Sequence, residues 1–231
     1  RAALAGERVD HVPASFWFHF PEEHRCRRPM AEAHLRYYEA CDPDWLKVMN
    51  DTRYESPAGY VTGRAEFDLE KLATPLPLTS ECFESFLDGL RIILDALAGD
   101  APTIVTLFCP YATLNYMTLK QADALIREEP EACLSALGGI AETLVDFSRA
   151  CIDAGAWGMY YSAQAGERGR LADEEHGRFV EPFDRQVLEA IADAPFNLLH
   201  VCGENVRMDP YWTYPAGCIN CWTPASPHPS P

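Results

Sequence analysis

The sequence predicts an α/β fold of the (β/α)8 barrel type, and three observations support this class. Short segments rich in β-branched and aromatic residues alternate with amphipathic helical patterns, as in repeated βα units. The strand segments are apolar on both faces, as parallel sheets require. No glycine-rich dinucleotide fingerprint follows the first predicted strand, which favours a barrel over an open doubly wound sheet.

Six short segments have the composition of buried strands. Their β-branched and aromatic residues favour extended backbone, and polar or turn-forming residues bound each segment. The predicted strands are residues 14–18, 45–50, 103–108, 157–161, 197–201 and 218–222.

Helices are predicted where apolar residues recur at helical spacing. The clearest pattern begins at Ser80 and ends at Gly99, and Pro130 divides the next two helices, the second of which ends at Gly155. Pro182 suits the first turn of the last helix. The predicted helices are residues 30–40, 80–98, 118–129, 131–154 and 182–192, with 51–77 irregular and 164–177 a polar loop.

The composition excludes several classes of partner. The 231 residues carry 19 basic and 35 acidic side chains, a formal charge of −16, which would repel nucleic acid and anionic membranes. No apolar run approaches the roughly 18 residues of a membrane span, and we find no signal peptide. Nine irregularly spaced cysteines, an odd number, indicate reduced thiols in a cytoplasmic protein.

The predicted elements do not complete a barrel. A full (β/α)8 barrel takes roughly 250 residues, and six strands are counted in residues 1–222, which we interpret as one barrel domain incomplete at its C-terminal end. Residues 223–231 are rich in proline and are expected to form a disordered tail. Open sheet edges would favour self-association, so a homo-oligomer is expected.

Polar residues collect just after the predicted strands. The C-terminal ends of parallel barrel strands share one face, where active sites lie, so these side chains predict a small-molecule site. Singly, each has an ordinary alternative: Asp51 could cap a turn, and Tyr116 could be a core aromatic with a satisfied hydroxyl. The candidates are Asn50, Asp51, Tyr111, Tyr116, Ser162 and Gln164.

His200 and Cys202 form a candidate metal pair. They are two residues apart at the end of a predicted strand, so their side chains project to one side, and imidazole and thiolate both bind zinc. Gly203 then permits a sharp turn. A hydrogen-bonded core histidine and a buried cysteine are the alternative. Cys218 and Cys221 could close a four-ligand zinc site, but alternation in a strand directs them to opposite faces.

Four segments resemble the uroporphyrinogen decarboxylase superfamily, which also contains cobalamin-dependent methyltransferases. Residues 1–13 are similar to its "R-x-x-L-x-G-E-x-x-D-x-x-P" signature, and residues 110–117 to the "P-W-T-L-x-x-Y-M" segment of the decarboxylases. Residues 153–162 resemble their "D-A-G-A … D-S" strand, and residues 200–203 the zinc motif of the methyltransferases. The resemblance implies a (β/α)8 barrel.

The methyltransferase branch implies the function that we expect first, which is zinc-dependent methyl transfer between a corrinoid carrier and a thiol-type acceptor. By this resemblance His200 and Cys202 bind zinc, and the family's third ligand is a cysteine in a C-terminal part of the barrel that we expect this chain to lack. A corrinoid protein is then an expected partner. The resemblance assigns Asp51, Tyr116 and Ser162 to the site of the reaction, and His19, Asn50, Tyr111 and Gln164 are expected to contact the substrate.

The decarboxylase branch is the alternative and needs no metal. Asp51 would stabilise charge on pyrrole N–H groups, and Tyr116 and Ser162 would position the carboxylates of a tetrapyrrole. Two departures weaken this interpretation. Residues 19–23 replace the family's arginine-rich loop with an acidic one, although Arg25 lies close by, and Tyr161 replaces the aspartate before the serine. A barrel that binds a ligand without turnover is the third hypothesis.

Overall fold

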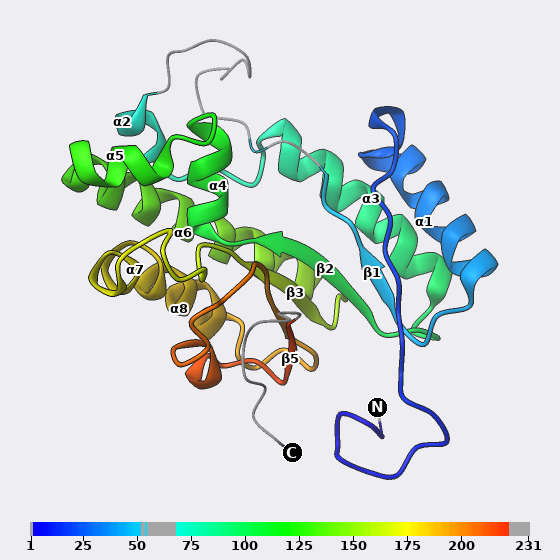
Figure 1. Ribbon diagram of the computed structural model, residues 1–231. Helices are drawn as coiled ribbons and strands as arrows, with labels where there is room; N and C mark the ends of the chain where they lie inside the picture. The colour runs from blue at the N-terminus through cyan, green and yellow to red at the C-terminus, as the bar shows by residue number, and fades with distance from the viewer. Residues whose placement is uncertain (1, 52–53, 55–67, 222–231) are drawn as a thin grey trace.

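The computed structural model describes residues 2–51, 54 and 68–221. Within them, five strands form a single parallel sheet whose order follows the chain (Figure 1). The sheet confirms the predicted α/β class with parallel βα units. Its strands are β1 (Leu46–Val48), β2 (Thr103–Phe108), β3 (Gly158–Ala163), β4 (Leu198–Val201) and β5 (Cys218–Cys221).

Helices connect successive strands and cover one face of the sheet (Figure 1). The long helices are α1 (Arg27–Cys41), α3 (Glu81–Leu97), α6 (Pro130–Asp153) and α8 (Glu181–Ala190). No helix of the described segments is long and apolar enough to cross a membrane. The shorter elements are η1 (Glu22–His24), α2 (Leu69–Leu72), α4 (Pro110–Met117), α5 (Ala122–Glu128), α7 (Asp173–Phe179) and η2 (Tyr211–Thr213).

The apolar faces predicted from helical spacing form the main core. In α3, Phe86, Leu90 and Ile93 are fully buried and pack with the apolar side chains of α6 and of the sheet. Gly139 in α6 allows a close approach to α2, because a Cβ atom there would lie 2.5 Å from the backbone of Ala73. Glycine is therefore required at this helix contact.

Alternation along the strands separates two kinds of side chain. Val105, Leu107 and Tyr161 belong to the buried cluster beneath the helices. The other face, which is the inner face of a barrel, carries the polar residues Lys47, Thr106, Tyr160, Ser162, His200 and Asn220, as the strand register shows.

The predicted strand at residues 14–18 is wrong. These residues form no element, and Phe16, Trp17 and Phe18 are 65%, 49% and 55% exposed. The segment runs past β1 (Figure 1), where Ala14 bonds to Asp44 through both its N–H and its carbonyl oxygen. Its aromatic composition favours extended backbone, but no strand pairs with it. The described residues therefore contain five strands, not the predicted six.

Three helices were missed, and the shortest, α2, lies within the predicted irregular segment 51–77. Helix α4 begins with Pro110 at its first position, and the Cys109 Sγ caps it by accepting a hydrogen bond from the Ala112 N–H at 3.4 Å. Helix α7 lies within the predicted polar loop 164–177, where the Glu175 side chain accepts a hydrogen bond from the Ala172 N–H at 2.8 Å. The helix predicted from residue 118 begins at 122. The described residues do not include most of the predicted irregular segment 51–77, nor Trp222 and the predicted tail at 223–231. The predicted end of the barrel domain at residue 222 therefore stays a prediction.

Candidate functional site

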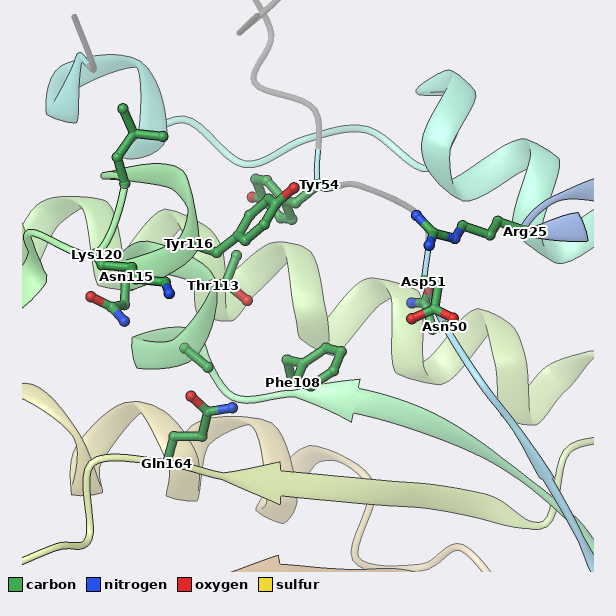
Figure 2. A pocket seen from close by; sticks show the side chains of 12 residues that line it. Arg25, Asn50, Asp51, Tyr54, Phe108, Thr113, Asn115, Tyr116, Lys120 and Gln164 are labelled. Atoms are coloured by element: carbon green, nitrogen blue, oxygen red, sulfur yellow. The ribbon is translucent and has the colours of Figure 1, made fainter. Parts of the chain in front are cut away.

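A cavity of about 650 Å³ lies where β1, β2 and β3 end (Figure 2). Four of the predicted site residues, Asn50, Asp51, Tyr116 and Gln164, line it. They come together because parallel strands end at the same edge of the sheet. The remaining lining residues are Arg25, Tyr54, Phe108, Ala112, Thr113, Asn115, Leu119 and Lys120.

Asp51 is held at the edge of this cavity by a hydrogen bond to His19, another of the predicted site residues. His19 Nδ1 lies 2.8 Å from Asp51 Oδ1, and the side chains are 55% and 13% exposed. The hydrogen bond fixes one carboxylate oxygen of Asp51. The structure thus places His19 beside the cavity, although His19 does not itself line it.

Helix α4 supplies one wall of the cavity. Tyr116 is 47% exposed and projects into it with Thr113 (Figure 2). The Asn115 Oδ1 is buried and has no hydrogen-bond partner in the described part of the chain. A buried amide oxygen is costly when unpaired, so Asn115 is suited to accept a hydrogen bond from a ligand.

Two basic residues, which the motif analysis did not assign to the site, give the cavity positive charge. Arg25 and Lys120 line it, and within residues 2–51, 54 and 68–221 no carboxylate forms an ion pair with either of them. Arg25 Nε donates to the Phe20 carbonyl oxygen at 3.1 Å. In a chain with a formal charge of −16, these cations favour an acidic ligand.

Ser162 and Tyr111 lie elsewhere. Ser162 is 6% exposed on the inner face of β3, and its Cα pairs in register with that of His200. Tyr111 is 1% exposed, and its hydroxyl donates to Asp123, whose carboxylate also bonds to Arg170. These bonds connect α4 to α5 and to the loop before α7. Tyr111 therefore stabilises α4, the helix that forms one wall of the cavity, without lining the cavity itself.

The predicted metal pair lies at the end of β4. His200 Nδ1 is 2.7 Å from the Asn220 Oδ1 on β5. Since this oxygen accepts, Nδ1 carries the proton and Nε2 keeps its lone pair. Burial lowers the pKa of His200, which favours the neutral form that a metal requires. Cys202 is exposed and directly follows β4, two residues after His200.

A complete metal cluster is not formed by the described residues, which bring no three His, Cys, Asp or Glu side chains close enough to hold an ion. Cys218 and Cys221, the further ligands of the four-ligand alternative, lie in β5, where alternation directs their side chains to opposite faces of the sheet. His200 and Cys202 fit zinc as two ligands, with Asn220 orienting the imidazole, and zinc needs further ligands.

The uroporphyrinogen decarboxylase (URO-D) family model matches residues 55–218. The chain belongs to this family. Among curated URO-D proteins, the uroporphyrinogen decarboxylase of Mus musculus is 28% identical over 136 residues, 55% of this chain and 36% of that protein. The enzyme from Carboxydothermus hydrogenoformans is 27% identical over 156 residues, 64% of this chain and 43% of that protein. The chain thus spans less than half the length of these relatives.

A solved methyltransferase from Methanosarcina mazei has a similar fold. Its TM-score is 0.64 at 18% identity, covering 90% of this chain and 69% of that one. At this identity the likeness shows the fold alone, and it agrees with the barrel-type architecture predicted for this URO-D chain.

Two basic cavity residues outside the motif segments, Arg25 and Lys120, were not predicted as site residues. Lys120 comes to the cavity because α4 begins at Pro110 and ends at Met117, and a proline directly after an apolar strand is a signal for a helix start that could have found it. For Arg25 the sequence offers only its proximity to the acidic loop at residues 19–23.

Proposed function

We propose that this URO-D family protein transfers a methyl group between a corrinoid carrier protein and a thiol-type acceptor, with zinc held at His200 and Cys202. The observation that carries the proposal is the hydrogen bond from His200 Nδ1 to Asn220 Oδ1 at 2.7 Å. Metal-binding histidines commonly donate their second N–H to such an oxygen, which fixes the tautomer and the ring orientation.

The residues around the pair support this chemistry. Bound zinc lowers the pKa of a thiol and holds the thiolate as a nucleophile. Tyr160 stacks on the His200 ring with centroids 5.3 Å apart and restrains its orientation from the other side. Arg25 and Lys120 in the neighbouring cavity would bind an acidic group of the acceptor.

Zinc content tests the proposal directly. We expect about one zinc per chain in the purified protein after reconstitution. His200→Ala and Cys202→Ala should each lose the metal, whereas Cys41→Ala, which removes an exposed thiol from α1, should keep it. Circular dichroism should show that all variants are folded.

Two results would contradict the zinc proposal. A wild-type protein without zinc after reconstitution would remove its basis, and so would a Cys202→Ala variant that retains a full equivalent. Methyl transfer to a thiol, measured by loss of free thiol in the presence of a methylated corrinoid, should disappear in the same two ligand variants and persist in Cys41→Ala.

Tetrapyrrole decarboxylation is the second candidate, favoured by the cavity in which Asp51 faces Tyr116 and two basic residues. Asp51 would stabilise positive charge on a pyrrole, and Arg25 would bind a carboxylate. Incubation with uroporphyrinogen under reducing conditions tests this. Decarboxylated products that vanish in Asp51→Asn and persist in the Cys202→Ala variant would favour it over methyl transfer.

A further inference from the structure

Lys47 occupies an unusual place on the inner face of the sheet. The chain has three lysines, Lys47, Lys71 and Lys120. Lys47, at the centre of β1, is only 4% exposed. Within the segments that the structure describes, no carboxylate forms an ion pair with its amine. A buried lysine with no ionic partner is rare, because the charged form loses its hydration.

Two aromatic rings enclose the amine. Lys47 Nζ lies 3.6 Å from the centroid of Tyr160 and 4.2 Å from that of Trp17. The rings favour the ammonium form, whereas burial favours the free amine. Burial lowers the pKa of Lys47 to about 7, and the charge of Asp51 opposes this shift. At neutral pH a large share of the molecules therefore carries an unprotonated, nucleophilic amine.

These rings also connect Lys47 to both halves of the candidate site. Trp17 packs edge-on against His19, with ring centroids 5.0 Å apart, and His19 bonds to Asp51 at the cavity. On the other side, Tyr160 stacks on His200. Lys47 thus lies between the cavity and the metal pair.

Trp17 is the more exposed of the two rings that contact the amine. Its side chain is 49% exposed, and it belongs to the segment of residues 14–18, which pairs with no strand. Movement of this one indole would open the amine to a small molecule while Tyr160, on β3, stays in place.

We propose that Lys47 is a covalent site for small aldehydes and oxo acids, where its amine forms a Schiff base once Trp17 moves aside. Desolvation of a lysine amine, as at the buried Lys47, favours the free amine and so activates it for this reaction. The Lys47 nitrogen attacks the carbonyl carbon, a proton passes from nitrogen to oxygen, and loss of water leaves the C=N bond. The site is separate from the methyl transfer and decarboxylation proposed above, and rests on neither.

Reductive trapping tests the site in the wild-type protein. Glyoxylate with cyanoborohydride converts a Schiff-base lysine into N-carboxymethyl-lysine, since hydride adds to the imine carbon. Peptide mapping at pH 7 should show labelling of Lys47 about tenfold faster than that of Lys71 or Lys120, whose amines keep ordinary reactivity. The preference should disappear in denatured protein. Equal labelling of the three lysines, or an unlabelled Lys47, would overturn the proposal.

Two variants test separately whether Lys47 supplies the reacting amine and whether Trp17 limits access to it. Trp17→Ala should raise the labelling rate of Lys47, whereas Trp212→Ala, which removes another half-exposed indole, should not. Lys47→Arg keeps the charge and cannot form a Schiff base, so labelling should be confined to Lys71 and Lys120. An unchanged rate in Trp17→Ala would refute the role of the indole as a cover, and wild-type labelling decides the proposal if Lys47→Arg does not fold.

Discussion

His200 and Asn220 join neighbouring strands through their side chains, with Nδ1 of the imidazole 2.7 Å from Oδ1 of the amide. Their Cα atoms are also paired in the register of β4 and β5. The orientation of the imidazole on β4 therefore depends on a residue 20 positions later in the chain.

Removing this amide should weaken zinc binding. Asn220→Ala leaves His200 Nδ1 without its acceptor, and loss of such a partner costs about 10–100-fold in metal affinity. Competition with a chelating dye measures the affinity. Asn220→Asp keeps an acceptor oxygen and should retain most of the affinity. Equal affinity in Asn220→Ala and the wild type would show that the amide does not orient the ligand.

Two adjacent glycines in α6 should respond oppositely to alanine. A Cβ atom at Gly139 would lie 2.5 Å from backbone atoms of Ala73, whereas one at Gly138 meets nothing within 4 Å. Gly139→Ala should destabilise the protein by about 1–3 kcal/mol, and Gly138→Ala should stabilise it by about 0.5–1 kcal/mol. Urea unfolding measures both. A Gly139→Ala variant as stable as wild type would contradict the tight contact between α2 and α6.

Asp184 should make stability depend on pH. Its carboxyl group is fully buried and accepts hydrogen bonds from the Tyr161 and Tyr214 hydroxyls at 2.7 and 3.3 Å. Burial outweighs these bonds and raises its pKa to about 7. The folded state thus binds a proton that the unfolded state releases, and its stability falls as pH rises from about 4 to 7.

Asp184→Asn should remove this dependence. Relative to wild type, the variant should gain about 2–3 kcal/mol of unfolding free energy between pH 5 and pH 8. Urea unfolding at the two pH values gives the difference. Asp193→Asn is the matched control, because that carboxylate is 74% exposed in an ion pair with Arg149. A gain of the same size in the control would rule out burial of Asp184 as the cause.

His34 should stabilise the protein in its neutral form. Its Nε2 accepts from the Met49 N–H at 2.9 Å, and its Nδ1 donates to the Met30 carbonyl oxygen at 2.8 Å, which ties α1 to the end of β1. His34→Ala leaves the Met49 N–H without its acceptor, whereas the Met30 carbonyl keeps the helical hydrogen bond from the backbone N–H of residue 34, and the loss should cost about 1–3 kcal/mol. Burial lowers the pKa of His34, so this contribution is present above pH 6.5 and is lost as pH falls. A variant that unfolds like wild type at pH 7.5 would refute the prediction.

The sequence predicted the elements that repeat a clear pattern. The apolar spacing after Ser80 located α3, and Pro130 and Gly155 bounded α6 to within two residues, because periodicity and turn residues act locally. Residues 14–18 show the limit of the method. Their composition favours a strand, but a strand also needs a neighbour to pair with, and that depends on tertiary structure.

The candidate site was predicted to a similar degree. Asp51, Tyr116 and Gln164 line the cavity because strand ends converge, a property of the fold class. The orientation of Tyr111 away from the cavity depends on the start of α4, which the sequence analysis missed. Lys47 escaped notice because a lysine in a short apolar strand gives no local sign of the two rings that enclose it in the folded chain.

Each strand of the sheet pairs with the strand that immediately precedes it in the chain. During synthesis on the ribosome, β2 can therefore dock on β1 once α3 has emerged, and β3, β4 and β5 can follow in turn. After β1, no strand of this sheet has to wait for a later one before it finds its first partner, so the sheet can grow in the direction of translation. The growing edge carries the unpaired backbone groups at each stage, and the next βα unit to leave the exit tunnel covers them.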